Sequence, residues 1–155
     1  MSPEFAFGPA LEDAYRVESN KAVYPRIVLS KRVREAIGSY MASYNDQVAP
    51  TPQNHAVRVD RAGVMFIDYL QHIFASPDRD QQEEAVASHQ QAVVSGLLDT
   101  MYDPSANDKL QWARRYHNHF VATHFADQTS LLIEELEPPL EFMSLGEFWN
   151  AGGRP

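Results

Sequence analysis

The sequence predicts a mainly helical α+β fold with one small sheet, and three observations lead to that expectation. The chain has 155 residues, of which 44% are hydrophobic and 11% aromatic, enough to form one globular core. Most of the apolar residues recur at spacings of three and four, which is typical of amphipathic helices. Only two short stretches, residues 26–29 and 56–67, carry the β-branched or alternating patterns of strands.

The first expected element is a helix from about Pro9 to Lys21. Pro9 suits a first helical turn, and apolar residues follow it at helical spacing. The helix ends before Tyr24-Pro25, because the residue preceding a proline avoids the helical region. Residues 26–29 then form a short apolar run typical of a buried strand.

A second helix is expected after Ser30, a favourable N-cap residue. Three basic residues, Lys31, Arg32 and Arg34, occupy its first turn, where positive charge opposes the helix dipole. We therefore expect them to face a partner or a neighbouring acidic surface. The apolar positions of this helix keep helical spacing: Val33, Ala36, Ile37, Tyr40, Met41 and Tyr44.

A proline-containing loop at 49–54 precedes a predicted hairpin near residues 56–67. Residues 56–59 alternate, residues 60–63 form a turn, and residues 64–67 are a second apolar segment. The second segment fits either a strand or the start of a helix that runs through Phe74. We favour a short hairpin that passes quickly into helix.

Three helical segments are predicted in the second half. Ser76-Pro77-Asp78 starts a long helix that ends near Asp103-Pro104, and Asp108 caps the next one. A last helical segment covers residues 130–136 and is stopped by Pro138-Pro139. Apolar residues beyond it are expected to pack back onto the body of the protein: Leu140, Phe142, Leu145, Phe148 and Trp149.

The net charge of −8 disfavours nucleic acid and membrane surfaces as partners, because an acidic surface repels phosphates and anionic headgroups. Residues 1–75 carry eight basic and eight acidic residues, whereas residues 76–155 carry five and thirteen. The absence of cysteine excludes disulfides, thiolate metal sites and cysteine nucleophiles. It also fits a cytoplasmic protein. No stretch approaches the roughly 20 apolar residues that span a bilayer.

Common enzyme motifs, such as a phosphate-binding loop or a dinucleotide fingerprint, are absent. The histidine spacing disfavours a metal site, because His117 and His119 lie on opposite sides of a helix and His124 is two turns from His117. The stretch Trp112–Phe120 is rich in both polar and aromatic groups. It fits either a buried helix whose polar side chains satisfy backbone groups or a recognition surface.

Two segments of the first half, Gly8–Glu18 and Pro25–Val33, together resemble the latter half of a class III nucleotidyl cyclase domain. The family pattern places an apolar residue, Asn, Ala and Arg at fixed offsets after a Gly, followed by a loop and an apolar strand that ends in Ser. The Ala14-Tyr15 and Pro25-Arg26-Ile27 variants look closest to the pyrimidine cyclases of bacterial anti-phage signalling, which make cyclic CMP or cyclic UMP. The corresponding residues here are Gly8, Leu11, Glu12, Ala14, Arg16 and the strand Ile27 to Ser30.

The resemblance implies two catalytic residues, Arg16 and Glu12. Arg16 takes the place of the family arginine that stabilises charge on the phosphates in the transition state, a role that suits a guanidinium fork. Arg16 also fits an exposed helical residue that pairs with Glu12 one turn earlier. Glu12 stands where the family has an Asn that orients the ribose, and a carboxylate there repels triphosphate unless a cation intervenes.

The family binds two metal ions, Mg²⁺ or Mn²⁺, through a pair of aspartates upstream of this helix. Before Gly8 this sequence offers only Glu4, so the chain is expected to hold no metal or cofactor and to be inactive alone. Residues 1–5 look like a translated cloning linker, and Phe5 falls at the base-selecting position of the family.

The resemblance therefore divides the chain into a cyclase-like C-terminal segment, residues 6–48, and a helical extension packed on it, residues 49–155. Residues 60–70 and 110–118 also look like parts of the C-terminal extensions of such bacterial proteins.

Two functional hypotheses follow. In the first, a longer parent protein converts a nucleoside triphosphate into a 3′,5′-cyclic nucleotide at a site between two protomers, and this chain contributes Arg16. In the second, the chain is a non-enzymatic dimerisation or partner-docking domain in which the Arg16 helix is structural. A homodimer is expected under both hypotheses.

Overall fold

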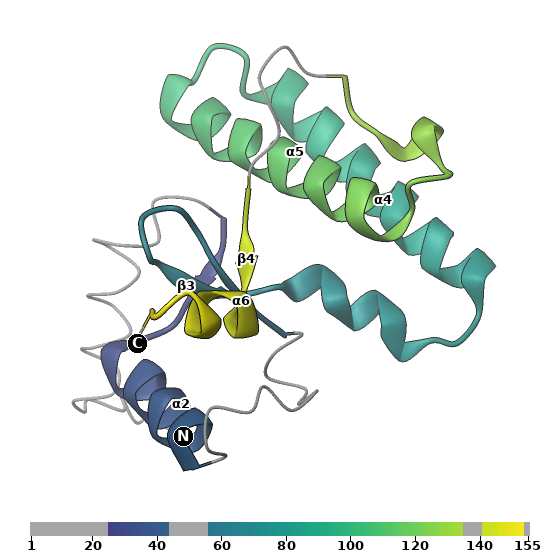
Figure 1. Ribbon diagram of the computed structural model, residues 1–155. Coiled ribbons are helices and arrows are strands. Elements are labelled where there is room, and N and C mark those ends of the chain that lie inside the picture. The colour runs from purple at the N-terminus through teal and green to yellow at the C-terminus, as the bar shows by residue number, and fades with distance from the viewer. Residues whose placement is uncertain (1–24, 44–55, 135–140, 154–155) are drawn as a thin grey trace, which may run out of the picture. The chain divides into compact units, whose positions relative to one another are not determined.

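The computed structural model describes residues 25–43, 56–134 and 141–153, which are mainly helical with one small antiparallel sheet (Figure 1). The α+β class expected from the sequence is confirmed. The helix expected over 9–21, the loop 49–54 and the boundary near residue 48 lie outside the described residues. The chain divides into two compact units, Met1–Ile67 with Met143–Pro155 (unit 1) and Asp68–Phe142 (unit 2), which we describe separately.

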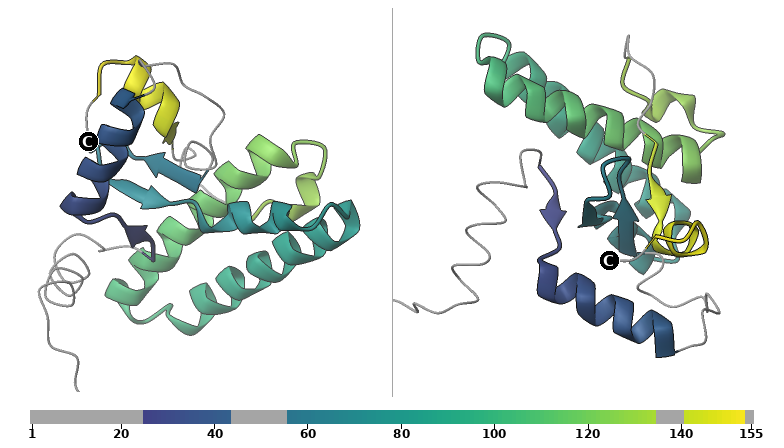
Figure 2. Two further views of the ribbon diagram at one scale, coloured as in Figure 1. Left: turned by 90° about the horizontal axis from the view of Figure 1, so that it is seen from below. Right: turned by 60° about the vertical axis from the view of Figure 1, so that its left-hand side comes forward.

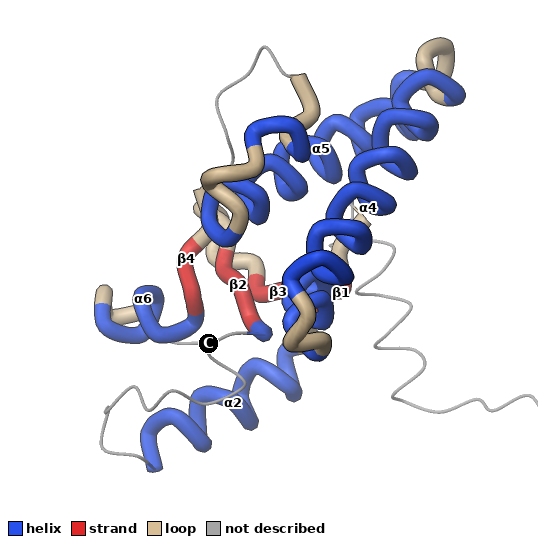
Figure 3. The backbone as a smooth tube through the Cα atoms, turned by 90° about the vertical axis from the view of Figure 1, so that its right-hand side faces the viewer, coloured by secondary structure: helices blue, strands red, loops and turns tan. Residues whose placement is uncertain are grey.

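Unit 1 contains the sheet, whose strands are β1 (Ile27–Val28), β2 (Val57–Val59), β3 (Met65–Ile67) and β4 (Met143–Ser144). The strand order is β1-β3-β2-β4, and all neighbours are antiparallel (Figure 3). The predicted strand and hairpin are thereby confirmed, but the expected burial of the strand is wrong, because β1 lies at the edge of the sheet and Ile27 is 60% exposed. Strand β4 is not predicted from the sequence, and it brings the C-terminal segment to the free edge of β2.

The hairpin turn between β2 and β3 is organised by Asp60. Its Oδ1 accepts hydrogen bonds from the backbone N–H groups of Ala62 and Val64, both at 2.9 Å. Gly63 has φ +76°, a left-handed conformation that glycine adopts without steric cost. The turn residues therefore fix the register that pairs Val59 with Met65.

The core of unit 1 lies on one face of the β2–β3 hairpin. Alternation places Val57 and Val59 on that face, and both are almost fully buried. Helix α2 (Lys31–Ser43) adds Met41, and the short helix α6 (Leu145–Asn150) adds Leu145 and Trp149. The apolar C-terminal residues Leu145 and Trp149 thus pack back onto the protein as expected.

The two helices that the structure describes in unit 1, α2 and α6, each begin after a serine. The Ser30 Oγ accepts a hydrogen bond from the Val33 N–H at 3.4 Å, which agrees with the predicted start of α2. At the start of α6, the Ser144 Oγ accepts from the Glu147 N–H while the Glu147 carboxylate accepts from the Ser144 N–H. This capping box satisfies donors that the first turn leaves free.

Unit 2 is a pair of antiparallel helices, α4 (Arg79–Asp99) and α5 (Pro104–His124), which lie side by side (Figure 2). Two 3₁₀ segments accompany them, η1 (Tyr69–Ala75) and η2 (Thr129–Leu131). The quick passage from the hairpin into helix is confirmed by η1. The buried apolar residues are Leu70, Ile73, Val86, Val93, Trp112, Ala113, Tyr116, Phe120, Val121, Phe125, Leu131 and Ile133.

Two predicted helix boundaries are wrong. Helix α4 ends at Asp99, because the helical hydrogen-bond pattern then gives way to tight turns: the Met101 N–H donates to the Leu98 carbonyl and the Asp103 N–H to the Thr100 carbonyl. Helix α5 is capped by Asp103, whose side chain accepts from the N–H groups of Ser105 and Ala106. Asp108, the cap expected from the sequence, lies inside α5.

The helix predicted over residues 130–136 is also wrong within its described part. Only one 3₁₀ turn, Thr129–Leu131, forms there, and Leu132 is extended. The carbonyl groups of this segment accept hydrogen bonds from side chains of α4 and α5 instead of continuing a helix. No helix in residues 25–43, 56–134 or 141–153 is long and apolar enough to cross a membrane.

Candidate functional site

Arg16 and Glu12, the catalytic residues that the resemblance implies, lie outside the described residues. The structure does describe the second part of the cyclase-like motif, Pro25–Val33. Strand β1 pairs with β3, the Leu29 N–H donates to the Met65 carbonyl at 2.9 Å, and α2 follows Ser30 directly. The expected apolar strand is therefore present in the sheet of unit 1, but it is shorter than expected: β1 ends at Val28, and Ser30 lies at the start of α2.

Arg26, at the start of this motif, has a structural position that the sequence does not reveal. Its side chain is only 6% exposed, and its Nη1 lies 2.6 Å from Oδ2 of Asp60 in the hairpin turn. The guanidinium also lies 5.5 Å from the centre of the Phe66 ring, within reach of a cation–π contact. Arg26 thus joins the segment before β1 to the β2–β3 turn.

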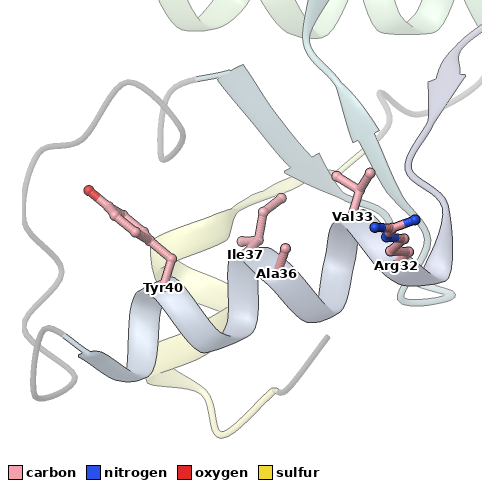
Figure 4. A pocket seen from close by; sticks show the side chains of 5 residues that line it. All are labelled: Arg32, Val33, Ala36, Ile37 and Tyr40. Atoms are coloured by element: carbon pink, nitrogen blue, oxygen red, sulfur yellow. The ribbon is translucent and has the colours of Figure 1, made fainter.

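The described part of unit 1 carries a shallow groove of about 370 Å³ on α2. Figure 4 shows the side chains that line it, which project from the same side of the helix. The lining is mostly apolar, with one cation at the N-terminal end. We call this surface the α2 groove and define it by Arg32, Val33, Ala36, Ile37 and Tyr40.

The polar and aromatic stretch Trp112–Phe120 of α5 faces the interior of unit 2, which confirms its interpretation as a buried helix. The Tyr116 hydroxyl donates to Asp68 Oδ1 at 2.5 Å and accepts from the Leu70 N–H at 3.3 Å. The Asn118 amide donates to the Ile133 carbonyl at 2.7 Å and accepts from the Ile133 N–H at 2.9 Å. The Tyr116 and Asn118 side chains thus bond to backbone groups of Leu70 and Ile133 that have no partner in a helix or strand.

A directed chain of hydrogen bonds crosses unit 2 through two histidines. His117 Nε2 lies 2.8 Å from the Leu131 carbonyl oxygen, the Nδ1 atoms of His117 and His89 are 3.0 Å apart, and His89 Nε2 lies 3.1 Å from the Tyr69 hydroxyl. A carbonyl only accepts, so His117 carries its proton on Nε2. In the neutral ring Nδ1 then accepts from His89, whose Nε2 in turn accepts from the Tyr69 hydroxyl.

Burial keeps two histidines and two tyrosines, in and beside this series of hydrogen bonds, uncharged. Desolvation, with smaller contributions from His117 and His72, lowers the pKa of His89 from 6.5 to about 4. Desolvation also lowers the pKa of His117. Burial and the neighbouring Asp68 raise the pKa of Tyr69 to about 12, and the same causes raise that of Tyr116. All four groups are therefore uncharged at neutral pH.

The planes of the two histidine rings differ by 18°, and their Nδ1 atoms point at each other. These two nitrogen atoms therefore form a hydrogen bond with each other. Among the residues that the structure describes, no group of three or more His, Asp or Glu side chains is placed to hold a metal ion. The sequence indicated a polar interior for α5. It did not indicate the partner histidine, because His89 lies 28 residues away on α4.

The chain was compared with known proteins at three levels. No family model matches it, and neither a curated protein nor a solved structure matches it significantly.

Proposed function

We propose that the chain is the C-terminal portion of a nucleotidyl cyclase-like protein, which converts a nucleoside triphosphate into a 3′,5′-cyclic nucleotide. The pyrimidine variants of the motif favour cyclic CMP or cyclic UMP as the product and anti-phage signalling as the setting. Metal-binding aspartates, with Mg²⁺ or Mn²⁺, come from residues that precede this chain, so the chain alone does not cyclise nucleotide.

The observation that supports this proposal is the placement of the Pro25–Val33 motif. Its residues Ile27 and Val28 form β1 in an antiparallel sheet, and Ser30 follows two residues later at the start of α2. The family pattern has an apolar strand ending in serine at this place. The other residues that match the family pattern, Gly8 to Arg16, precede this strand in the sequence and are separated from it by a short stretch.

The proposed chemistry is an intramolecular displacement at phosphorus. The ribose 3′-oxygen loses its proton and attacks the α-phosphorus, and the bond to pyrophosphate breaks. Arg16 stabilises the negative charge that spreads over the phosphate oxygens, because its planar guanidinium can donate two parallel hydrogen bonds. Glu12 stands at the ribose-orienting position, where its carboxylate weakens binding of the triphosphate.

The test uses the full-length product of the natural gene with Mn²⁺ and each of the four ribonucleoside triphosphates. Formation of cyclic nucleotide and pyrophosphate is expected with a pyrimidine substrate. Arg16→Ala should lower the rate by roughly 100-fold or more, a typical loss for one charge-stabilising donor. Lys21→Ala is the matched control, since it removes one positive charge from the same expected helix and should leave the rate unchanged.

Two outcomes contradict the proposal. One is a full-length protein that leaves all four triphosphates unconverted. The other is an upstream sequence without a pair of metal-binding aspartates. Glu12→Asn adds a positive test, because restoring the amide of the family pattern should lower KM for the triphosphate.

A second candidate function is a dimerisation or partner-docking domain, and exposed apolar surface favours it. The α2 groove includes Val33, which is 44% exposed, and four apolar residues at the end of α4 are also exposed. Contiguous exposed apolar residues of this kind are typical of protein–protein contacts. Light scattering on the 155-residue chain tests this candidate, and a monomer at every concentration contradicts it.

A further inference from the structure

The C-terminal end of α4 presents an apolar surface that the core of unit 2 does not use. Leu98 is 69% exposed, Met101 59%, and Tyr102 91%. Val94 precedes Leu98 by one turn, so the two side chains form a row on one side of the helix, and Met101 and Tyr102 continue past its end. We call this surface the α4 tip and define it by Val94, Leu98, Met101 and Tyr102.

The α2 groove has the complementary shape. Residues four apart line up along a helix, so Arg32, Ala36 and Tyr40 form one row, and Val33 and Ile37 form the next. Ala36 is the smallest of these residues, so its row has a depression in the middle. Helices pack by placing a row of one into the groove between rows of the other, and the Val94–Leu98 row matches such a groove.

The charges around the two surfaces are opposite. Asp99 and Asp103 are exposed beside the α4 tip, in a segment, residues 68–142, that holds thirteen acidic and four basic residues. Lys31, Arg32 and Arg34 lie at the N-terminal end of α2, where their charge opposes the helix dipole. An acidic partner at this end of α2 offsets that unfavourable interaction.

We propose that the α4 tip of one copy of this chain docks in the α2 groove of a second copy. The proposal deepens the second candidate function, on which it rests, and it needs no catalytic activity. Two different surfaces meet in this contact, so a pair of copies keeps one unused groove, on the copy that supplied the tip, and one unused tip, on the copy that supplied the groove. The patches are small, and the expected dissociation constant is about 10 µM or weaker.

The test measures self-association of the full 155-residue chain by sedimentation and light scattering over a range up to ~200 µM, well above that constant. Leu98→Glu places a charge on the tip, and Ala36→Glu fills the groove. Each is expected to weaken association by about tenfold or more, because Leu98→Glu brings a charge against an apolar lining and Ala36→Glu fills the groove and competes with the acidic tip for Arg32. The matched controls, Ser88→Glu on α4 and Ser39→Glu on α2, add the same charge at exposed positions outside both surfaces and should not change association.

Mixing the two variants separates this contact from a symmetric one. The Leu98→Glu chain keeps an intact groove and the Ala36→Glu chain keeps an intact tip, so the mixture should form one-to-one dimers that cannot extend. At the same concentrations, each variant alone should associate about tenfold or more weakly than the wild type. All four substitutions are at exposed helical positions, and circular dichroism checks that each variant is folded. Val94→Glu and Val33→Glu form a second pair with the same expected behaviour.

Four outcomes overturn the proposal. A wild-type chain that stays monomeric at every concentration contradicts both this contact and the proposed dimerisation function. If both variants associate as strongly as the wild type, the result contradicts this contact but agrees with a dimerisation function through another surface. Loss of association in only one of the two variants shows that the unaffected surface meets its own kind or is not used, and it contradicts this contact; so does a mixture that stays monomeric although the wild type associates.

Discussion

The Nδ1 atoms of His89 and His117 lie 3.0 Å apart, and only one of them can carry a proton. The direction of the hydrogen bonds from Tyr69 through the two histidines is set at one end, because the Leu131 carbonyl can only accept a hydrogen bond from His117. A proton added to His117 Nδ1 places two N–H groups face to face and breaks the bond between the histidines. A proton added to His89 Nε2 instead meets the Tyr69 hydroxyl and ends the hydrogen bond that this hydroxyl donates. This arrangement makes unit 2 sensitive to acid.

Stability should fall as the pH drops from 6.5 towards 4. Unfolded histidine takes up a proton near pH 6.5, whereas folded His89 resists it until about pH 4, so the unfolded state binds more protons in this window. One such histidine should cost about 1 kcal/mol between pH 6.5 and 5, after a discount for its partial exposure. Urea unfolding at several pH values measures the change. His89→Phe should reduce the pH slope in this window, and an unchanged slope would contradict the assignment.

Tyr116→Phe should destabilise unit 2 by about 2 kcal/mol. The substitution removes the hydroxyl that donates to Asp68 and accepts from the Leu70 N–H, and it leaves a carboxylate that is 3% exposed with one donor fewer. The free energy of unfolding in urea is the measurement. Tyr102→Phe makes the same chemical change at a residue that is 91% exposed, so it should have no measurable effect.

Asn118→Asp should detach the segment at Ile133 from α5. The amide now donates to one backbone group of Ile133 and accepts from the other, whereas a carboxylate can only accept and is repelled by the Ile133 carbonyl. We expect a loss of about 2 kcal/mol and faster hydrogen exchange at the Ile133 amide. Gln81→Glu is the control, because its Oε1 already accepts from Ser76 at an exposed site. Unchanged exchange at Ile133 would refute the role of Asn118.

Arg26→Met should destabilise unit 1 by about 2 kcal/mol, because it leaves the Asp60 carboxylate, 18% exposed, without its guanidinium partner. Lys31→Met breaks an ion pair with Glu35 at 3.5 Å, but both side chains are more than half exposed. That exposed pair should contribute less than about 0.5 kcal/mol. Thermal unfolding of the two variants checks the contrast, and equal losses would argue against a structural Arg26–Asp60 pair.

Much of the fold is predictable because its signals are local. Alternation in residues 56–59, the turn at Asp60 and Gly63, the Asp78 cap of α4 and the 3.6-residue periodicity of α2 and α5 depend on neighbouring residues. The helix boundary at Asp99 and Asp103 was mispredicted, because Asp103 and Asp108 are both good caps and only the observed bonds to Ser105 and Ala106 distinguish them.

The sequence by itself determined a mainly helical chain with a hairpin and an acidic second half, since composition and short-range pattern carry those features. The tertiary structure decided which distant groups meet. Strand β4 joins β2 across a sequence separation of more than 80 residues, Arg26 reaches Asp60, and His89 reaches His117. Such pairings depend on burial and on the direction of each hydrogen bond, and neither is encoded in the spacing of residues along one element.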